Sequence, residues 1–229
     1  MAVEPDEDLD EEEPEDPPSP PELVAALDEM LSLAVEAPPP YYPDASDTDR
    51  LVHTLMAVGR LHALCHTHAG LLGAERPPAD EEEREWAAER DLEFVRRCAD
   101  ELVELAARCV RFAVWLWADL RPEGEARREA RRNAAAEARE EALFELGISA
   151  QRPRTSLTAD KHRVADFLRP TLAFAALQCA DAAHEMEDRQ FPGTAGSTML
   201  DLAASLLSDG DEIATAAGYS AWPGLGGDG

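Results

Sequence analysis

Basic residues are absent from the first 45 positions of this 229-residue chain, which carry fifteen acidic residues and ten prolines. The complete sequence has 21 basic and 48 acidic residues, giving a formal net charge of −27 at pH 7. Binding to nucleic acid or to an anionic membrane requires clustered cations near the phosphates. We therefore expect no nucleic-acid partner and no membrane partner, whereas a basic protein partner fits the charge.

Long apolar runs are also absent. The densest run, residues 112–117, is far shorter than the roughly 20 residues that a membrane-spanning helix needs. Residues 1–9 have neither the basic nor the apolar region of a secretory signal. Both observations predict a cytoplasmic protein. Lys161 is the single lysine among 21 basic residues, and this preference for Arg indicates a GC-rich genome, bacterial or viral.

Familiar catalytic motifs are missing as well. The sequence has no nucleophile elbow, Gly-rich phosphate loop, dinucleotide fingerprint or CxxC pair. The four cysteines all fall on the apolar side of a predicted helix: Cys65, Cys98, Cys109 and Cys179. A reduced thiol packs there as a small hydrophobe. We therefore expect no cofactor, and a non-enzymatic protein is favoured over an enzyme.

Helical periodicity is what the sequence has in abundance. Its clearest example lies in a helix predicted from about residue 80 to residue 120, where seven apolar residues follow strict 3-4 spacing: Val95, Cys98, Leu102, Leu105, Cys109, Phe112 and Leu116. Such spacing is typical of the seam of a helix bundle or coiled coil. The seam can be covered within the chain, or it can join two copies in a homodimer.

Other helices are predicted around this long central one. Their ranges are 22–36, 46–73, 125–146, 158–186 and 197–207. Because no strand pattern occurs, the predicted fold is an all-α bundle of about five or six helices, with the second, third and fifth at the core. The predicted domains are an acidic, Pro-rich arm at 1–45, one helical domain at 46–208 and a Gly-rich tail at 209–229.

Details of these helices are also predicted. Leu51, Leu55, Val58, Cys65 and Leu72 share one face of the second helix. In the fourth helix, alanine is the sole apolar residue type between 125 and 141, so this stretch should be largely exposed. Leu143, Phe144 and Leu146 then anchor the helix before Gly147 ends it. We expect the fifth helix to be capped near Thr158, and the segment Asp209, Gly210, Asp211 and Glu212 to form a loop that leads into a helical turn.

The acidic arm contains two candidate partner-binding segments. Residues 4–16 are too charged to bury a core and should be disordered. Beyond them, four apolar residues at helical spacing form an amphipathic helix that docks either on its own chain or on a partner: Leu23, Leu27, Met30 and Leu31. Pro38, Pro39 and Tyr41 belong to a PPxY sequence of the kind that WW domains bind, or else to a stiff spacer. Truncating residues 1–45 should leave folding intact and weaken partner binding.

Two groups of residues are candidate metal ligands. His62 and His66 are spaced i, i+4 and could chelate one ion from a helix face, with a hydrogen-bonded core histidine as the alternative. Two pairs of acids, each one helical turn apart, form the second group: Glu82, Glu85, Glu101 and Glu104. Their arrangement is loosely similar to the ExxE and ExxD pairs with which MazG-type pyrophosphohydrolases hold Mg²⁺ on phosphates. Here the second pair ends in Glu, and both pairs fall on one helix.

Three hypotheses about function follow. The leading one is a non-enzymatic helical adaptor or regulatory protein that acts through protein contacts, using the central seam and residues 23–35. The second is a metal-dependent nucleotide phosphohydrolase built on the paired carboxylates. The third is a phage or viral structural component. The adaptor is favoured because the chain carries no strong catalytic signature.

Overall fold

The computed structural model describes residues 20–36, 46–68, 79–118, 125–152, 156–187 and 193–218. Every regular element in these ranges is an α-helix, which confirms the predicted all-α class. The six helices are α1 (Pro21–Glu36), α2 (Asp47–His68), α3 (Glu81–Trp117), α4 (Glu125–Ala150), α5 (Lys161–Glu187) and α6 (Thr194–Ala216). No helix among them is long and apolar enough to cross a membrane. The disorder predicted for residues 4–16, together with Pro38, Pro39, Tyr41 and Leu72, lies outside the described ranges.

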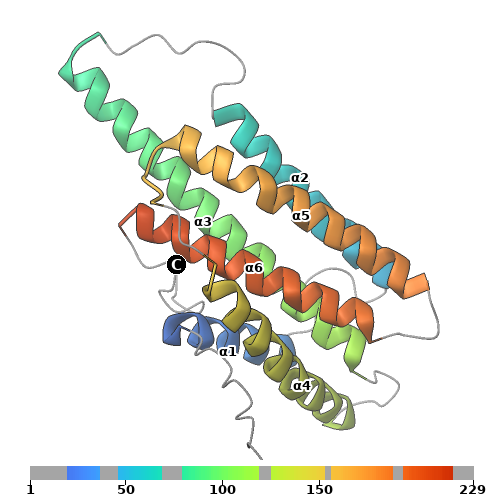
Figure 1. Cartoon of the computed structure of the whole chain (residues 1–229). Coiled ribbons are helices and arrows are strands. Elements are labelled where there is room, and N and C mark those ends of the chain that lie inside the picture. The colour runs from blue at the N-terminus through green and yellow to red at the C-terminus, as the bar shows by residue number, and fades with distance from the viewer. Residues whose placement is uncertain are drawn as a thin grey trace, which may run out of the picture.

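The helices pack as a bundle around α3 and α6 (Figure 1). On one side of this central pair, α2 and α5 lie side by side. On the other side, α1 and α4 pack against each other and against α3. The predicted seam of α3 is buried inside this arrangement, apart from the half-buried Leu116. Because the chain covers the seam itself, the seam is not free to join two copies.

The last helix is the main difference from the prediction. We expected a short helix at 197–207, with a loop at Asp209, Gly210, Asp211 and Glu212; instead α6 runs unbroken through this segment. It packs on α3, α4 and α5, so it belongs to the core from which the prediction omitted it. Gly210 is buried within α6 and does not break it. A Cβ there would lie 3.6 Å from that of Leu102 and 3.8 Å from the carbonyl oxygen of Ala99, both ordinary van der Waals distances, so the packing of α6 on α3 does not require glycine at this position.

Helix α1 docks on its own chain. Leu23, Leu27 and Met30 are each only 1% exposed, and they face α3 and α4. Residues 125–141 of α4 are largely exposed, as predicted, and the helix buries a stripe of alanines within this stretch and just beyond it: Ala134, Ala135, Ala138 and Ala142. These small side chains leave room for α1 to approach. A bidentate ion pair, with Arg139 Nε 2.6 Å and Nη2 3.1 Å from the Asp28 carboxylate, joins the two helices at the surface.

Two helix ends also differ from the prediction. Gly147 does not end α4, which continues to Ala150, and Gly147 is buried within it. Helix α5 is capped by Asp160 and not by Thr158, because the Asp160 carboxylate accepts hydrogen bonds from the backbone N–H groups of His162 and Arg163 at 3.0 and 2.9 Å. The packed core extends beyond both predicted domain limits, because it includes α1 before residue 46 and Ile213 after residue 208.

Candidate functional site

An exposed apolar pair on α4 has acidic surroundings. Phe144 is 51% exposed and Ile148 is 43% exposed, one helical turn apart. We expected Phe144 to anchor the helix, but Leu146 does so, because it is completely buried. Glu141 and Glu145 lie next to the pair on the same helix. We call Glu141, Phe144, Glu145 and Ile148 the α4 face.

The α4 face borders an acidic groove between α4, α5 and α6. This groove has a volume of about 480 Å³, and its lining includes five carboxylates: Glu141, Glu145, Asp181, Glu185 and Asp201. Neither Lys nor Arg is among the described residues that line it. Hydrogen bonds to neighbouring helices hold two of the acids in place, from Gln178 to Asp201 at 2.9 Å and from Thr198 to Glu185 at 2.8 Å.

Two carboxyl groups of the groove are difficult to ionise. Burial, and next the charges of Asp201 and Glu141, raise the pKa of Glu145 above its ordinary value. Burial also raises the pKa of Asp201, although Arg152 opposes this. Burial is therefore the main reason that both carboxyl groups resist ionisation. A cationic group bound beside them would favour their charged forms and lower both pKa values.

A second exposed apolar face lies on α2. Val52 is 48% exposed, Leu55 45% and Met56 53%, and we call these three residues the α2 face. We expected Leu55 to share the buried face of this helix, but the buried side is turned towards Leu51, Thr54, Ala57, Val58, Leu61 and Cys65. Helix α2 contains two aspartates, two arginines and four histidines, so its formal charge is zero with neutral histidines, and Arg50 is paired with Asp47. The surroundings of the α2 face are therefore less acidic than those of the α4 face.

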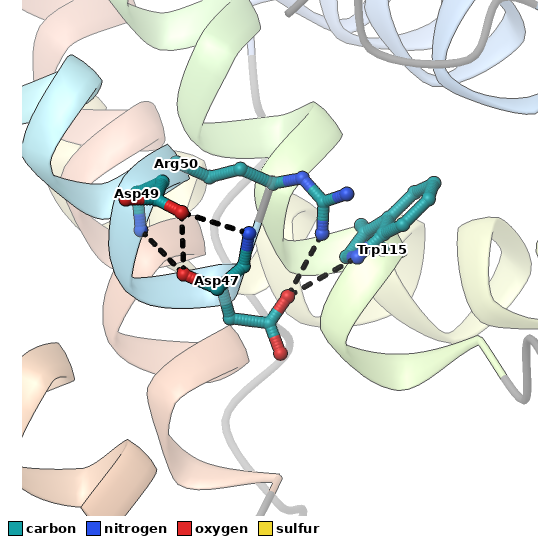
Figure 2. Close-up of polar contacts among 5 residues, drawn as sticks. Asp47, Asp49, Arg50 and Trp115 are labelled. Carbon is teal, nitrogen blue, oxygen red and sulfur yellow. Dashed lines mark hydrogen bonds and ion pairs between the residues drawn. The ribbon is translucent and has the colours of Figure 1, made fainter. Parts of the chain in front are cut away.

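Polar contacts at the start of α2 fix its position against α3 (Figure 2). Ser46 and Asp49 form a capping box: the backbone N–H of Asp49 donates to the Ser46 hydroxyl at 3.2 Å, and the backbone N–H of Ser46 donates to the Asp49 carboxylate at 3.0 Å. The Ser46 hydroxyl also donates to that carboxylate at 2.7 Å, and this bond, followed by the one from the Ser46 backbone, lowers the pKa of Asp49. Because these hydrogen bonds fix its first turn, α2 presents its exposed side chains in a defined orientation.

Arg50 connects this start to the end of α3. Its guanidinium lies 3.7 Å from the centre of the Trp115 ring and donates to the Asp47 carboxylate at 2.9 Å. The Trp115 indole donates to the same carboxylate at 3.2 Å, as Figure 2 shows. Since the Arg50 side chain is only 9% exposed, the ion pair and the cation–π contact are partly shielded from water. Together they hold α2 on the bundle.

The predicted histidine ligands line a cavity between α2 and α5. His62 and His66 are exposed, and their rings stack with centroids 6.3 Å apart. The cavity has a volume of about 160 Å³, and His162, Asp166 and Cys65 also line it. Within the described part of the chain, no three His, Cys, Asp or Glu side chains are placed to hold one metal ion.

The predicted carboxylate pairs do not converge. Glu85 and Glu101 are sixteen residues apart on α3, which separates them by about 24 Å along one helix. Glu82, Glu85 and Glu104 are exposed to solvent. Glu104 forms ion pairs with Arg108 at 3.0 Å and Arg111 at 3.5 Å. These acids therefore behave as a solvated helix surface.

The candidate partner-binding residues of α1 are covered by the chain itself. Leu23, Leu27, Met30 and Leu31 are buried, so a partner could reach them only if α1 left the bundle. The α4 and α2 faces were missed at the sequence level. A signal for the α2 face exists, because Val52 and Met56 stand at i, i+4 outside the predicted apolar stripe.

Comparison of the chain with protein-family models, curated proteins and solved structures gave no match.

Proposed function

We propose that this protein is a non-enzymatic helical adaptor that contacts two protein segments, one at the α4 face and one at the α2 face. The observation that carries the proposal is the pair of exposed apolar faces on helices at opposite sides of the bundle, one in strongly acidic and one in nearly neutral surroundings. Exposed apolar side chains rimmed by charge are typical of interaction surfaces. Two faces that differ in charge would select different partners.

The partner expected at the α4 face is a basic amphipathic segment. Its apolar side chains would cover Phe144 and Ile148, and its Arg or Lys side chains would reach the acidic groove. Glu145 and Asp201 support this choice, because burial penalises their charge until a cation neutralises it. A basic partner also agrees with the net charge of −27.

The partner expected at the α2 face is a mainly apolar segment, which would cover Val52, Leu55 and Met56. Phe144 and Ile148 of a second copy could supply such a segment, so self-association is an outcome that must be distinguished from binding of another protein. A head-to-tail array of copies would favour the third hypothesis, a viral or phage structural component.

The phosphohydrolase hypothesis has little support, because its carboxylates stand apart along α3. A cytoplasmic location is part of the adaptor proposal. It is consistent with four cysteines that are all free thiols.

Binding of a designed peptide tests the adaptor proposal. The probe is a fluorescent, amphipathic helical peptide with leucines on one side and arginines on the other. We expect Phe144→Ala and Glu145→Gln each to weaken binding about tenfold, because each removes part of the α4 face. Fluorescence anisotropy of the full chain measures the affinity, and sedimentation velocity measures self-association.

Glu85→Gln is the matched control, because it removes the same charge from an exposed position on α3. Equal losses in Glu85→Gln and Glu145→Gln would mean that the peptide responds to net charge alone, and the α4 face would be rejected. Sedimentation as an array that Phe144→Ala dissolves would replace the adaptor with a self-assembling component.

A further inference from the structure

The four cysteines form two pairs across helix interfaces. Cys65 of α2 meets Cys98 of α3, whose thiol donates a hydrogen bond to the Cys65 sulfur. Cys109 of α3 and Cys179 of α5 are close enough for their charges to interact. All four are free and buried. The two pairs are alike in composition, so any difference in reactivity must come from their surroundings.

Access from solvent distinguishes the pairs. Cys65 lines the cavity of about 160 Å³ between α2 and α5 and keeps 6% of its surface exposed. A water molecule occupies about 30 Å³ of liquid, so a small peroxide fits in this space. Cys98 has 0% of its surface exposed. Cys109 is also 0% exposed and Cys179 only 2%. Cys65 is therefore the cysteine that a small oxidant in this cavity would reach first.

The pKa shifts of the four thiols also favour Cys65 as the reactive residue. The hydrogen bond from Cys98 lowers the pKa of the Cys65 thiol, and that bond, together with burial, raises the pKa of Cys98. Burial raises the pKa of Cys109 and brings that of Cys179 to about 11. The thiolate is the nucleophilic form of cysteine. Cys65 is thus the most easily ionised of the four thiols, with a second thiol next to it.

We propose that Cys65 is a peroxide-reactive thiol and that Cys98 is its resolving partner, so that a hydroperoxide entering the α2–α5 cavity links α2 to α3 by a disulfide. A reactive, accessible thiol beside a resolving thiol is the usual arrangement in redox-sensing cysteines. This inference is independent of the adaptor proposal.

The chemistry needs hydrogen peroxide as the oxidant. The Cys65 thiolate attacks one peroxide oxygen, the O–O bond breaks, and a sulfenic acid forms while hydroxide leaves and takes up a proton. The Cys98 sulfur then attacks the sulfenic sulfur, the S–O bond breaks, and the hydroxyl leaves as water with the Cys98 proton. Two thiols are oxidised to one disulfide, and one peroxide is reduced to two waters.

Peptide mapping of the full-length protein tests this proposal. The protein is treated with hydrogen peroxide, its remaining thiols are alkylated, and it is digested with trypsin under denaturing conditions. Arg97 and Arg108 bracket Cys98, so its peptide is distinct from that of Cys109. We expect a linked Cys65–Cys98 pair that is about 2 Da lighter than the two free peptides. In Cys98→Ser, dimedone should trap the sulfenic acid on Cys65.

The second thiol pair supplies the control. The double variant Cys109→Ser/Cys179→Ser should form the Cys65–Cys98 link at the rate of the unaltered protein. Alkylation of the unaltered, folded protein by iodoacetamide provides a measurement without any substitution, and Cys65 should react at least tenfold faster than Cys109. Equal labelling of Cys65 and Cys109, or oxidation of Cys65 that stops short of the disulfide, would overturn the proposal.

Discussion

Three glycines within helices differ in what faces them. A Cβ on Gly196 would overlap the indole of Trp117. That indole is fixed, because its N–H donates to the Gly193 carbonyl at 2.9 Å. A Cβ on Gly210 would meet α3 only at ordinary van der Waals distances, and Gly59 has nothing within 4 Å of the place where its Cβ would lie. Of the three positions, Gly196 is therefore the one where packing requires glycine.

Alanine substitution distinguishes these roles. We expect Gly196→Ala to lower the free energy of unfolding by about 1–3 kcal/mol, because Trp117 must move and its hydrogen bond breaks. Gly59→Ala should raise it by about 0.5–1 kcal/mol, because alanine favours the helix and meets no neighbour. Urea denaturation followed by tryptophan fluorescence measures both. A stabilising Gly196→Ala would show that Trp117 can leave its place freely.

At the scale of elements, α1 belongs to the folded body. It buries Leu27 against α3 and α4 while Leu33 on the same helix remains 37% exposed. The expectation that truncating residues 1–45 leaves folding intact therefore conflicts with the structure, because removal of α1 would uncover apolar surface on α3 and α4.

Two leucine variants test the contribution of α1. Leu27→Ala should lower the free energy of unfolding by about 2–5 kcal/mol through lost burial and a residual cavity. Leu33→Ala, its matched control, should change it by less than about 0.5 kcal/mol, because much of that side chain is already in water. Thermal unfolding followed by circular dichroism compares the two. If the two variants have the same melting temperature, α1 contributes little to the stability of the bundle.

At the scale of the whole molecule, carboxyl groups dominate the response to pH. Burial raises the pKa of Asp209, although its hydrogen bond from Thr171 at 2.6 Å opposes the shift. Glu145 and Asp201 are shifted in the same direction. Each group stabilises the folded chain fully below its unfolded-state pKa, and this stabilisation is lost as the pH rises through the raised folded-state pKa. The pKa of Asp49 is lowered, so its contribution is lost only at more acidic pH.

We therefore expect the protein to be more stable at about pH 5 than at about pH 7, and the reduced repulsion among its many carboxylates acts in the same direction. Urea unfolding midpoints at the two pH values measure the difference. Asp209→Asn, which keeps an oxygen acceptor for Thr171, should reduce the difference between the two midpoints. A midpoint that falls towards acid pH in the unaltered protein would contradict this prediction.

The sequence by itself determined the all-α class, the long central helix with its seam, and the amphipathic character of α1. These features follow from apolar periodicity, which depends only on the repeat of the helix. Helix α5 likewise buries a set of residues at helical spacing: Val164, Leu168, Leu172, Ala175, Cys179 and Ala182. Spacing along one helix, however, does not tell which element covers an apolar residue.

Tertiary structure alone decided the remaining features. It placed α6 at the core, because α6 packs on α3 and α4, which lie far from it in the sequence. It left Phe144 and Leu55 in solvent although both are apolar, because no neighbouring helix covers those sides of α4 and α2. It brought Cys65 to Cys98 and gathered acids from three helices into one groove. Burial and charge interactions depend on distances between segments remote in the sequence, and only the packed chain sets those distances.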